Sequence, residues 1–267
     1  MYEIKSSAKV FDQHRVFHYT LAGRPLVVET GKLAGLANGA CLVRYGETSV
    51  LCTATASEKP RDGIDFLPLS VDLEERMYSA GKIPGGYLKR EGKPSEKAVL
   101  TSRVIDRPVR PLFPKDLRND VALTLTVMSV DHDCEPEVVA MIGSSIALSI
   151  SDIPWNGPLG GLHIGLVDGK LVINPTEAER KVSDLELTVA ASREKVVMIE
   201  AGANQVDDDI VYDAIMKAHE EIKKLLVFIN GIVAEIGKPK FTFEKAAVNH
   251  DLLDDLIEYG LGQIEHA

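Results

Sequence analysis

Residues 137–150 constrain the fold more than any other segment, because nearly every position carries an apolar or small side chain. A helix that is apolar on all faces has to be covered on all faces, so it belongs inside a protein. Small residues such as Ala140, Gly143 and Ala147 would let neighbouring elements approach closely. Hydrophobic residues make up 45% of the 267 residues, which is ample apolar material for a core around this helix.

Most of the remaining regular structure is predicted to be strands. These segments alternate in polarity or are rich in β-branched residues, and glycines separate them. The expected strands are 14–20, 26–29, 40–43, 49–56, 66–73, 121–130, 162–167, 170–173, 185–191 and 196–200. Ser95 can cap a helix over 95–107, which should end near Asp106 because Pro108 disfavours helical geometry at the residue before it. The sequence therefore predicts a mixed α/β (α+β) fold.

A long helix is predicted over 208–236, where apolar residues recur every three or four positions in one stripe. The acidic triplet 207–209 favours a helix start, and Gly237 and Pro239 favour an end. We expect the stripe to pack on the protein's own sheet, with a coiled-coil dimer as the alternative.

The composition changes after this helix. We expect one domain over residues 1–237, and a linker with the start of a second domain over 238–267. Residues 250–263 look helical, but a lone short helix has little to pack on. The chain is therefore expected to be part of a longer protein.

Charge is unevenly distributed along the chain. The net charge is −10, but residues 82–118 contain ten Lys or Arg and four Asp or Glu, a local net of +6 that leaves −16 for the remainder. We call residues 82–118 the basic island. A local cluster of basic residues in an acidic protein is stronger evidence for an anionic ligand than a positive net charge of the whole chain, because a net charge can serve solubility alone.

The basic island begins in a loop. Residues 78–94, called the basic loop below, contain four glycines and two prolines and fit neither helix nor strand. Within it, Tyr87 is followed closely by Lys89 and Arg90. An aromatic ring beside cations suits single-stranded nucleic acid, because the ring stacks on a base while the cations hold phosphates.

Three arginines continue the island behind the loop. Arg103 and Arg107 are four residues apart and share one helix face, and Arg110 lies just beyond. The planar guanidinium suits phosphate, because it donates two parallel hydrogen bonds. The alternative is that these arginines pair with neighbouring acids such as Asp106.

Common catalytic and metal-binding signatures are absent from the sequence. There is no Gly-x-Ser-x-Gly, His-Glu-x-x-His or phosphate-cradling Gly-x-x-x-x-Gly-Lys motif, and the three cysteines form no Cys-x-x-Cys pair. The first residues do not form a signal-peptide pattern, and no apolar run approaches the roughly 20 residues of a membrane helix. We therefore expect reduced thiols, no membrane association and a cytoplasmic location.

Several longer runs together resemble one known family. Residues 90–96 (Arg-Glu-Gly-Lys-Pro-Ser-Glu) and 103–114 (Arg-Val-Ile-Asp-Arg-Pro-Val-Arg-Pro-Leu-Phe-Pro) look like the N-terminal RNase PH-like domain of the polynucleotide phosphorylase family. Supporting runs are 141–145, 153–158 and 173–176. The resemblance covers residues 5–240 and implies the ribosomal protein S5 domain 2-like fold. The tail resembles the opening of the family's all-α domain.

The resemblance implies a function for the intact protein. Family members are polyribonucleotide nucleotidyltransferases that degrade mRNA 3′-to-5′ with inorganic phosphate and Mg²⁺ or Mn²⁺. They form ring-shaped homotrimers that thread single-stranded RNA through a pore, and other RNA-degradation proteins are expected partners. The family's pore loop, Phe-Phe-Arg-Arg, matches residues 87–90, so Tyr87, Lys89, Arg90, Arg103, Arg107 and Arg110 are the expected RNA-binding residues. Because Leu88 replaces the second aromatic, stacking there should be weaker.

The resemblance also implies that this domain is not catalytic. Active copies carry a Gly/Ser/Thr-rich phosphate turn where this chain has Glu135 and Glu137, whose carboxylates would repel phosphate. In the family's metal-binding stretch, Arg180 and Glu186 replace the two carboxylate ligands and Thr188 replaces a lysine. We therefore expect no metal in this domain, since an arginine opposes a divalent ion.

Two alternatives to this assignment remain open at the sequence level. In one, the chain is itself an active phosphorolytic nuclease that uses Asp184 and Glu186. In the other, it is a purely structural scaffold domain.

Overall fold

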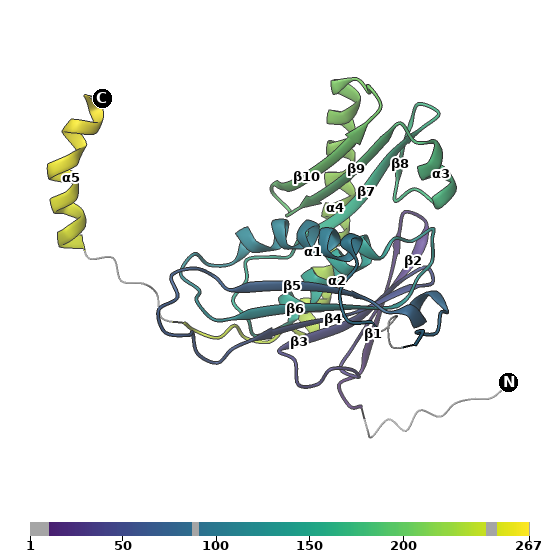
Figure 1. Ribbon diagram of the computed structural model, residues 1–267, viewed down its shortest axis with the longest axis horizontal. Coiled ribbons are helices and arrows are strands. Elements are labelled where there is room, and N and C mark those ends of the chain that lie inside the picture. Colours follow the sequence, from purple (N-terminus) through teal and green to yellow (C-terminus); the bar gives the residue numbers. More distant parts are fainter. Residues whose placement is uncertain (1–10, 87–90, 244–249, 267) are drawn as a thin grey trace.

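The computed structural model describes residues 11–86, 91–243 and 250–266, and it contains two β-sheets with helices packed between and beside them (Figure 1). The larger sheet has six strands in the order β1-β2-β3-β4-β6-β5. These strands are β1 (Arg15–Leu21), β2 (Arg24–Thr30), β3 (Gly39–Tyr45), β4 (Thr48–Ala56), β5 (Leu69–Glu75) and β6 (Val121–Ser129). All neighbours pair antiparallel except β5 and β6, which are parallel.

The smaller sheet has four antiparallel strands in the order β10-β9-β7-β8. Its strands are β7 (Gly160–Val167), β8 (Lys170–Ile173), β9 (Leu185–Ala191) and β10 (Val196–Ala203). The two sheets and the helices between them confirm the predicted mixed α/β class.

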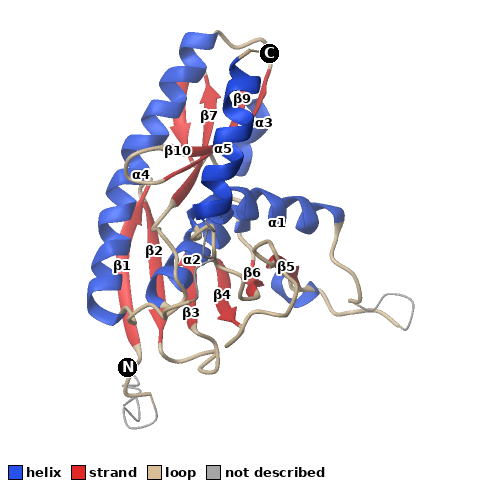
Figure 2. Ribbon diagram, turned by 90° about the vertical axis from the view of Figure 1, so that its left-hand side faces the viewer, coloured by secondary structure: helices blue, strands red, loops and turns tan. Residues whose placement is uncertain are grey.

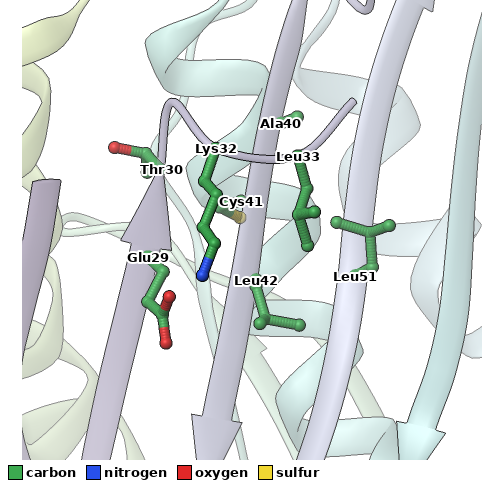
Figure 3. Close-up of a pocket in the computed structure, with 8 residues that line it drawn as sticks. All are labelled: Glu29, Thr30, Lys32, Leu33, Ala40, Cys41, Leu42 and Leu51. Carbon is green, nitrogen blue, oxygen red and sulfur yellow. The ribbon is translucent and has the colours of Figure 1, made fainter. Parts of the chain in front are cut away.

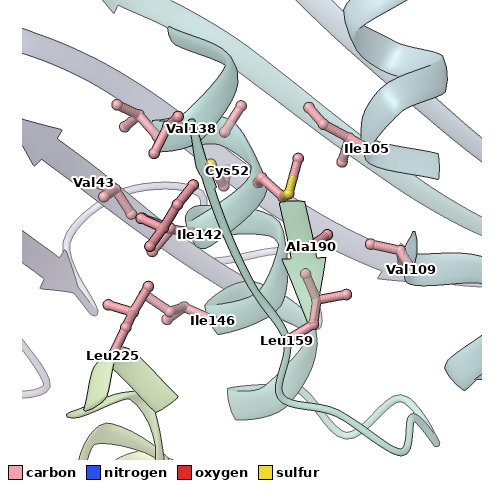
Figure 4. Packing of buried hydrophobic residues seen from close by; sticks show 14 of the residues in the cluster. Val43, Cys52, Ile105, Val109, Val138, Ile142, Ile146, Leu159, Ala190 and Leu225 are labelled. Atoms are coloured by element: carbon pink, nitrogen blue, oxygen red, sulfur yellow. The ribbon is translucent and has the colours of Figure 1, made fainter. Parts of the chain in front are cut away.

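Helix α2 (Pro136–Ile150) lies at the centre, as predicted from its apolar faces. Every residue from Val138 to Ile150 is buried, and the helix packs on β3, β4 and β7 (Figure 4). The approach is close, because a Cβ atom on Gly143 would lie 2.2 Å from Sγ of Cys52. Cys41, Cys52 and Cys134 are all buried free thiols, as expected from the sequence.

Helix α1 (Glu96–Val109) connects the parallel strands β5 and β6, and Ser95 caps it as expected by accepting a hydrogen bond from Ala98 N at 3.0 Å. The expected end near Asp106 is wrong, since the helix continues through Pro108 to Val109. Proline in the last turn removes one backbone donor, but its ring is buried and Asp106 O still accepts from Arg110 N. Packing therefore outweighs the local preference.

The Ser95 cap gives a testable prediction. Substituting Ser95→Ala should lower the free energy of unfolding by about 1 kcal/mol, because the amide of Ala98 loses its acceptor. Urea denaturation followed by circular dichroism measures this change. Ser95→Thr is the control, because its hydroxyl can still accept from Ala98 N and donate to Glu75. An alanine variant as stable as the wild type would contradict the role of the cap.

Helix α4 (Asp208–Ile236) has the predicted bounds, and Asp207 caps it. It runs along one side of the molecule and places its apolar stripe on β7, β9 and α2, so packing on the protein's own sheet is confirmed (Figure 2). Stacking of Phe228 on Tyr19 at 4.9 Å between ring centroids ties its second half to β1.

Some short elements were not predicted. The 3₁₀ turns η1 (Met77–Ala80) and η3 (Arg110–Leu112) and helix α3 (Glu177–Val182) fall where no helix was predicted. A capping box could have revealed α3, because Thr176 and Glu179 cap each other's backbone amides. Strand β5 starts at Leu69 rather than at Phe66, since Pro68 has no N–H to donate to a sheet.

After α4, the chain crosses the end of α2 and leads to helix α5 (His250–Glu265). Lys240 Nζ donates to three carbonyl oxygens there, those of Leu148, Ser149 and Ser151. Helix α5 stands apart from the two sheets in Figure 1, and its large apolar side chains are exposed. None of the helices in the described part of the chain is long and apolar enough to cross a membrane.

Candidate functional site

The first candidate surface is the basic island. Tyr87, Lys89 and Arg90 lie outside the described residues, so their role stays a prediction. In the described part of the basic loop, residues 82–86 and 91–94 form no helix or strand, as expected. Its first residues, 78–80, belong to η1, and its other end leads into α1.

The three arginines behind the loop differ in what they contact. Arg107 pairs with Glu200 of β10. Arg110 pairs with Asp106 at 2.8 Å, and its guanidinium also donates to the carbonyl oxygens of Leu67 and Leu69 beside the outer edge of β5.

All three arginines are exposed, and Arg103 differs from the other two in its contacts. It has no hydrogen bond or ion pair with any described residue, and it borders a hollow of about 170 Å³ between α1 and β5. The structure therefore supports the intramolecular alternative for Arg107 and Arg110 and leaves Arg103 available to a ligand.

The second candidate site lies at the start of α2, where segments far apart in the sequence meet. Glu135 and Glu137 face His163 of β7, with Oε2 of Glu135 at 3.6 Å from Nδ1 and Oε1 of Glu137 at 3.2 Å from Nε2. The Nε2 contact does not meet the geometry of a regular hydrogen bond, so we treat it as an ion pair. Arg180 of α3 approaches Glu135 at 3.8 Å and donates to the carbonyl oxygens of Pro175 and His132.

We call Glu135, Glu137, His163 and Arg180 the ion-pair cluster. Burial alone would lower the pKa of His163, but the contact with Glu137 and the charges of Glu135 and Glu186 raise it above its usual value. Burial opposes ionisation of Glu137, yet His163 holds the pKa of that carboxyl below its usual range. Both shifts favour the charged pair. The sequence carries no local signal for His163, because a lone histidine in a strand is usually structural.

The ion-pair cluster does not fit a divalent metal ion. The guanidinium of Arg180 lies beside Glu135 and is fixed by two carbonyl oxygens. Asp184 and Glu186, the alternative catalytic pair, are both exposed, while Thr188 of β9 is buried. Hard cations require several converging oxygen ligands, and a fixed cation among them opposes binding. Inorganic phosphate fits no better, since Glu135 and Glu137 would repel it.

A small hollow on the outer face of the large sheet offers no ligand site. It is lined by residues including Glu29, Lys32, Leu33 and Leu51 (Figure 3), and its volume is about 10 Å³. That is room for about one water molecule.

The fold and two family matches together define the class of protein. The solved structure of rice (Oryza sativa) Rrp46 matches with a TM-score of 0.63 and 13% identity, covering 84% of this chain and 97% of that one, which shows a common fold. Residues 22–154 match the 3′ exoribonuclease family, domain 1, and residues 157–221 match its domain 2. The chain therefore belongs to the RNase PH-like 3′ exoribonuclease family. The two matches divide the chain as the sheets do, with β2–β6 in the first and β7–β10 in the second.

Similar proteins make the match more specific. Polyribonucleotide nucleotidyltransferase of Ruminiclostridium cellulolyticum is 63% identical over 94% of this chain and 36% of its own length. The proteins of the same name from Clostridioides difficile and Caldicellulosiruptor saccharolyticus are 55% and 60% identical, over 96% and 90% of this chain and 36% and 34% of their own lengths. These relatives confirm the sequence resemblance. The chain spans about a third of the length of these relatives.

Proposed function

We propose that this chain is the RNA-gripping, non-catalytic RNase PH-like unit of a phosphate-dependent 3′-to-5′ exoribonuclease. The intact protein would degrade mRNA in the cytoplasm with inorganic phosphate and Mg²⁺ or Mn²⁺, releasing nucleoside diphosphates. It would work as a homotrimer, alongside other RNA-degradation proteins. In this proposal the unit covers residues 1–237, and residues 238–267 begin a helical domain.

The observation that carries the non-catalytic assignment is the ion-pair cluster. The stretches that resemble the phosphate turn and the metal-binding stretch of active relatives meet in space, and there Glu135 and Glu137 engage His163 and Arg180. Because these charged side chains pair with one another, they support a structural role for this site in place of ligand binding. Chemistry would then belong to another part of the longer protein.

The RNA-gripping assignment is supported by the basic island and the exposed Arg103. The scaffold alternative also has an observation in its favour, because Arg107 and Arg110 are engaged within the protein. The two functions differ in a measurable way. Phosphate contacts make RNA affinity fall steeply with salt, whereas a scaffold has no salt-dependent RNA binding.

The experiment incubates the purified chain with labelled single-stranded RNA, phosphate and Mg²⁺. We expect salt-dependent binding without release of nucleoside diphosphates. The double variant Lys89→Ala/Arg90→Ala should bind about tenfold more weakly at low salt, because two phosphate contacts are lost. Lys223→Ala/Lys224→Ala is the charge-matched control, since these lysines are paired with acids on α4 and should leave binding unchanged.

Two results would contradict the proposal. Release of nucleoside diphosphates by this chain would indicate that Asp184 and Glu186 still support catalysis. Absence of salt-dependent RNA binding would favour the scaffold alternative.

A further inference from the structure

We propose that Tyr78 is an additional base-stacking residue for single-stranded RNA, located at the base of the basic loop. This inference rests on the proposed RNA-binding function and adds to it a residue that the family resemblance did not indicate. It starts from the replacement at position 88, where leucine stands in place of the family's second aromatic. Single-stranded RNA bound at this loop would bind more tightly if another aromatic ring were available to stack on a base.

The backbone around Tyr78 is held firmly. It lies in η1, where Gly81 N donates to the carbonyl oxygen of Tyr78 at 3.0 Å and Lys82 N donates to that of Met77 at 2.9 Å. Val130 N donates to the carbonyl oxygen of Ser79 at 3.1 Å, which fixes η1 to the end of β6. A fixed backbone lowers the entropy lost when a ring stacks on a base.

The two ends of the basic loop meet at η1. The carboxylate of Glu91 accepts a hydrogen bond from Met77 N and lies 3.8 Å from Arg76. Arg76 also pairs with Glu74 at 2.6 Å, so both of these acids are engaged by the same arginine. Lys82 and Glu91 therefore both contact the turn that carries Tyr78.

The ring of Tyr78 is available to a ligand. The residue is 52% exposed, and the one polar contact of its hydroxyl in the described structure is Sδ of Met128 at 3.5 Å, a weak acceptor. Lys82 is exposed and has no partner among the described residues. Tyr78 and Lys82 are four residues apart on either side of the turn at Gly81, so one strand of RNA could meet an aromatic ring for a base and an ammonium group for a phosphate there.

The test compares Tyr78→Leu with the wild-type chain, using a fluorescein-labelled oligoadenylate of about 12 nucleotides, within the range of single-strand site sizes. Fluorescence anisotropy should show about tenfold weaker binding for Tyr78→Leu, since stacking on one base is lost. Tyr78→Phe keeps the ring and should bind as the wild type does. Tyr212→Leu is the matched control, because Tyr212 is 62% exposed on α4, away from the basic loop.

An abasic oligonucleotide of the same length distinguishes stacking from a structural role. It keeps the phosphates but has no bases, so the wild type and Tyr78→Leu should bind it equally. Equal loss on both oligonucleotides would mean that the substitution disturbs the loop, and would overturn the inference. So would unchanged binding of oligoadenylate by Tyr78→Leu, although RNA binding by the chain would still uphold the proposed function. Failure of the wild type to bind any RNA would overturn both.

Discussion

Substituting Gly39→Ala should destabilise the protein by about 3 kcal/mol, near the upper end for overpacking a core. Gly39 begins β3 where that strand crosses α2, and a Cβ atom there would lie 2.1 Å from the carbonyl oxygen of Ala147. The obstacle is the backbone of a helix that is buried on all sides, so it cannot rotate away as a side chain could. Urea denaturation followed by circular dichroism gives the free energy of unfolding.

Gly231→Ala is the matched control for this prediction. Gly231 lies within α4, and nothing stands within 4 Å of the position its Cβ would take. Alanine there should stabilise the protein by about 0.5–1 kcal/mol, because glycine is a poor helix former. Equal effects of the two substitutions would mean that α2 does not approach β3 as closely as described.

The second large effect is expected at the ion-pair cluster. His163→Gln should lower the free energy of unfolding by about 3 kcal/mol near pH 6, because Glu135 and Glu137 lose their charge partner in a largely buried place. His18→Gln is the control, since His18 is an exposed histidine on β1 and its replacement should change stability little.

The effect of His163→Gln should depend on pH. The folded-state pKa of His163 is raised above the ordinary 6.5, so its contribution is complete below about pH 6.5 and is lost as pH rises through the folded pKa. The folded-state pKa of Glu137 is lowered from 4.5, so its contribution is present above about pH 4.5 and is lost as pH falls through the folded pKa. Urea titrations from pH 5.5 to about 8.5 should show the two proteins converging. A stability difference that stays constant over this range would contradict the assignment.

The sequence predicted the parts of the fold that repeat a strong pattern. The apolar faces of α2 require that it be buried on all sides. The apolar stripe of α4 requires that one side of that helix be covered. The sequence failed where a local rule competed with packing. Pro108 should end a helix, but its ring is buried and the helix continues for one more residue.

The candidate site was harder to predict, because its meaning depends on contacts between distant residues. From the sequence alone, Arg103, Arg107 and Arg110 look like one phosphate-binding set, because they are the same residue type and lie close together in the chain. Only the folded structure shows that Arg107 and Arg110 have partners within the protein, because these partners are Glu200, 93 positions from Arg107, and carbonyl oxygens at the edge of β5. His163 was missed for the same reason, because its partners come from the start of α2.

The contacts of Arg110 affect how natural variation in this family should be interpreted. Its guanidinium occupies carbonyl oxygens beside an outer strand edge that could otherwise pair with another chain. Selection against aggregation would preserve this arginine even in a homologue that never meets RNA. Invariance at position 110 is therefore poor grounds for assigning an RNA contact, whereas invariance at position 103, which has no partner among the described residues, would be informative.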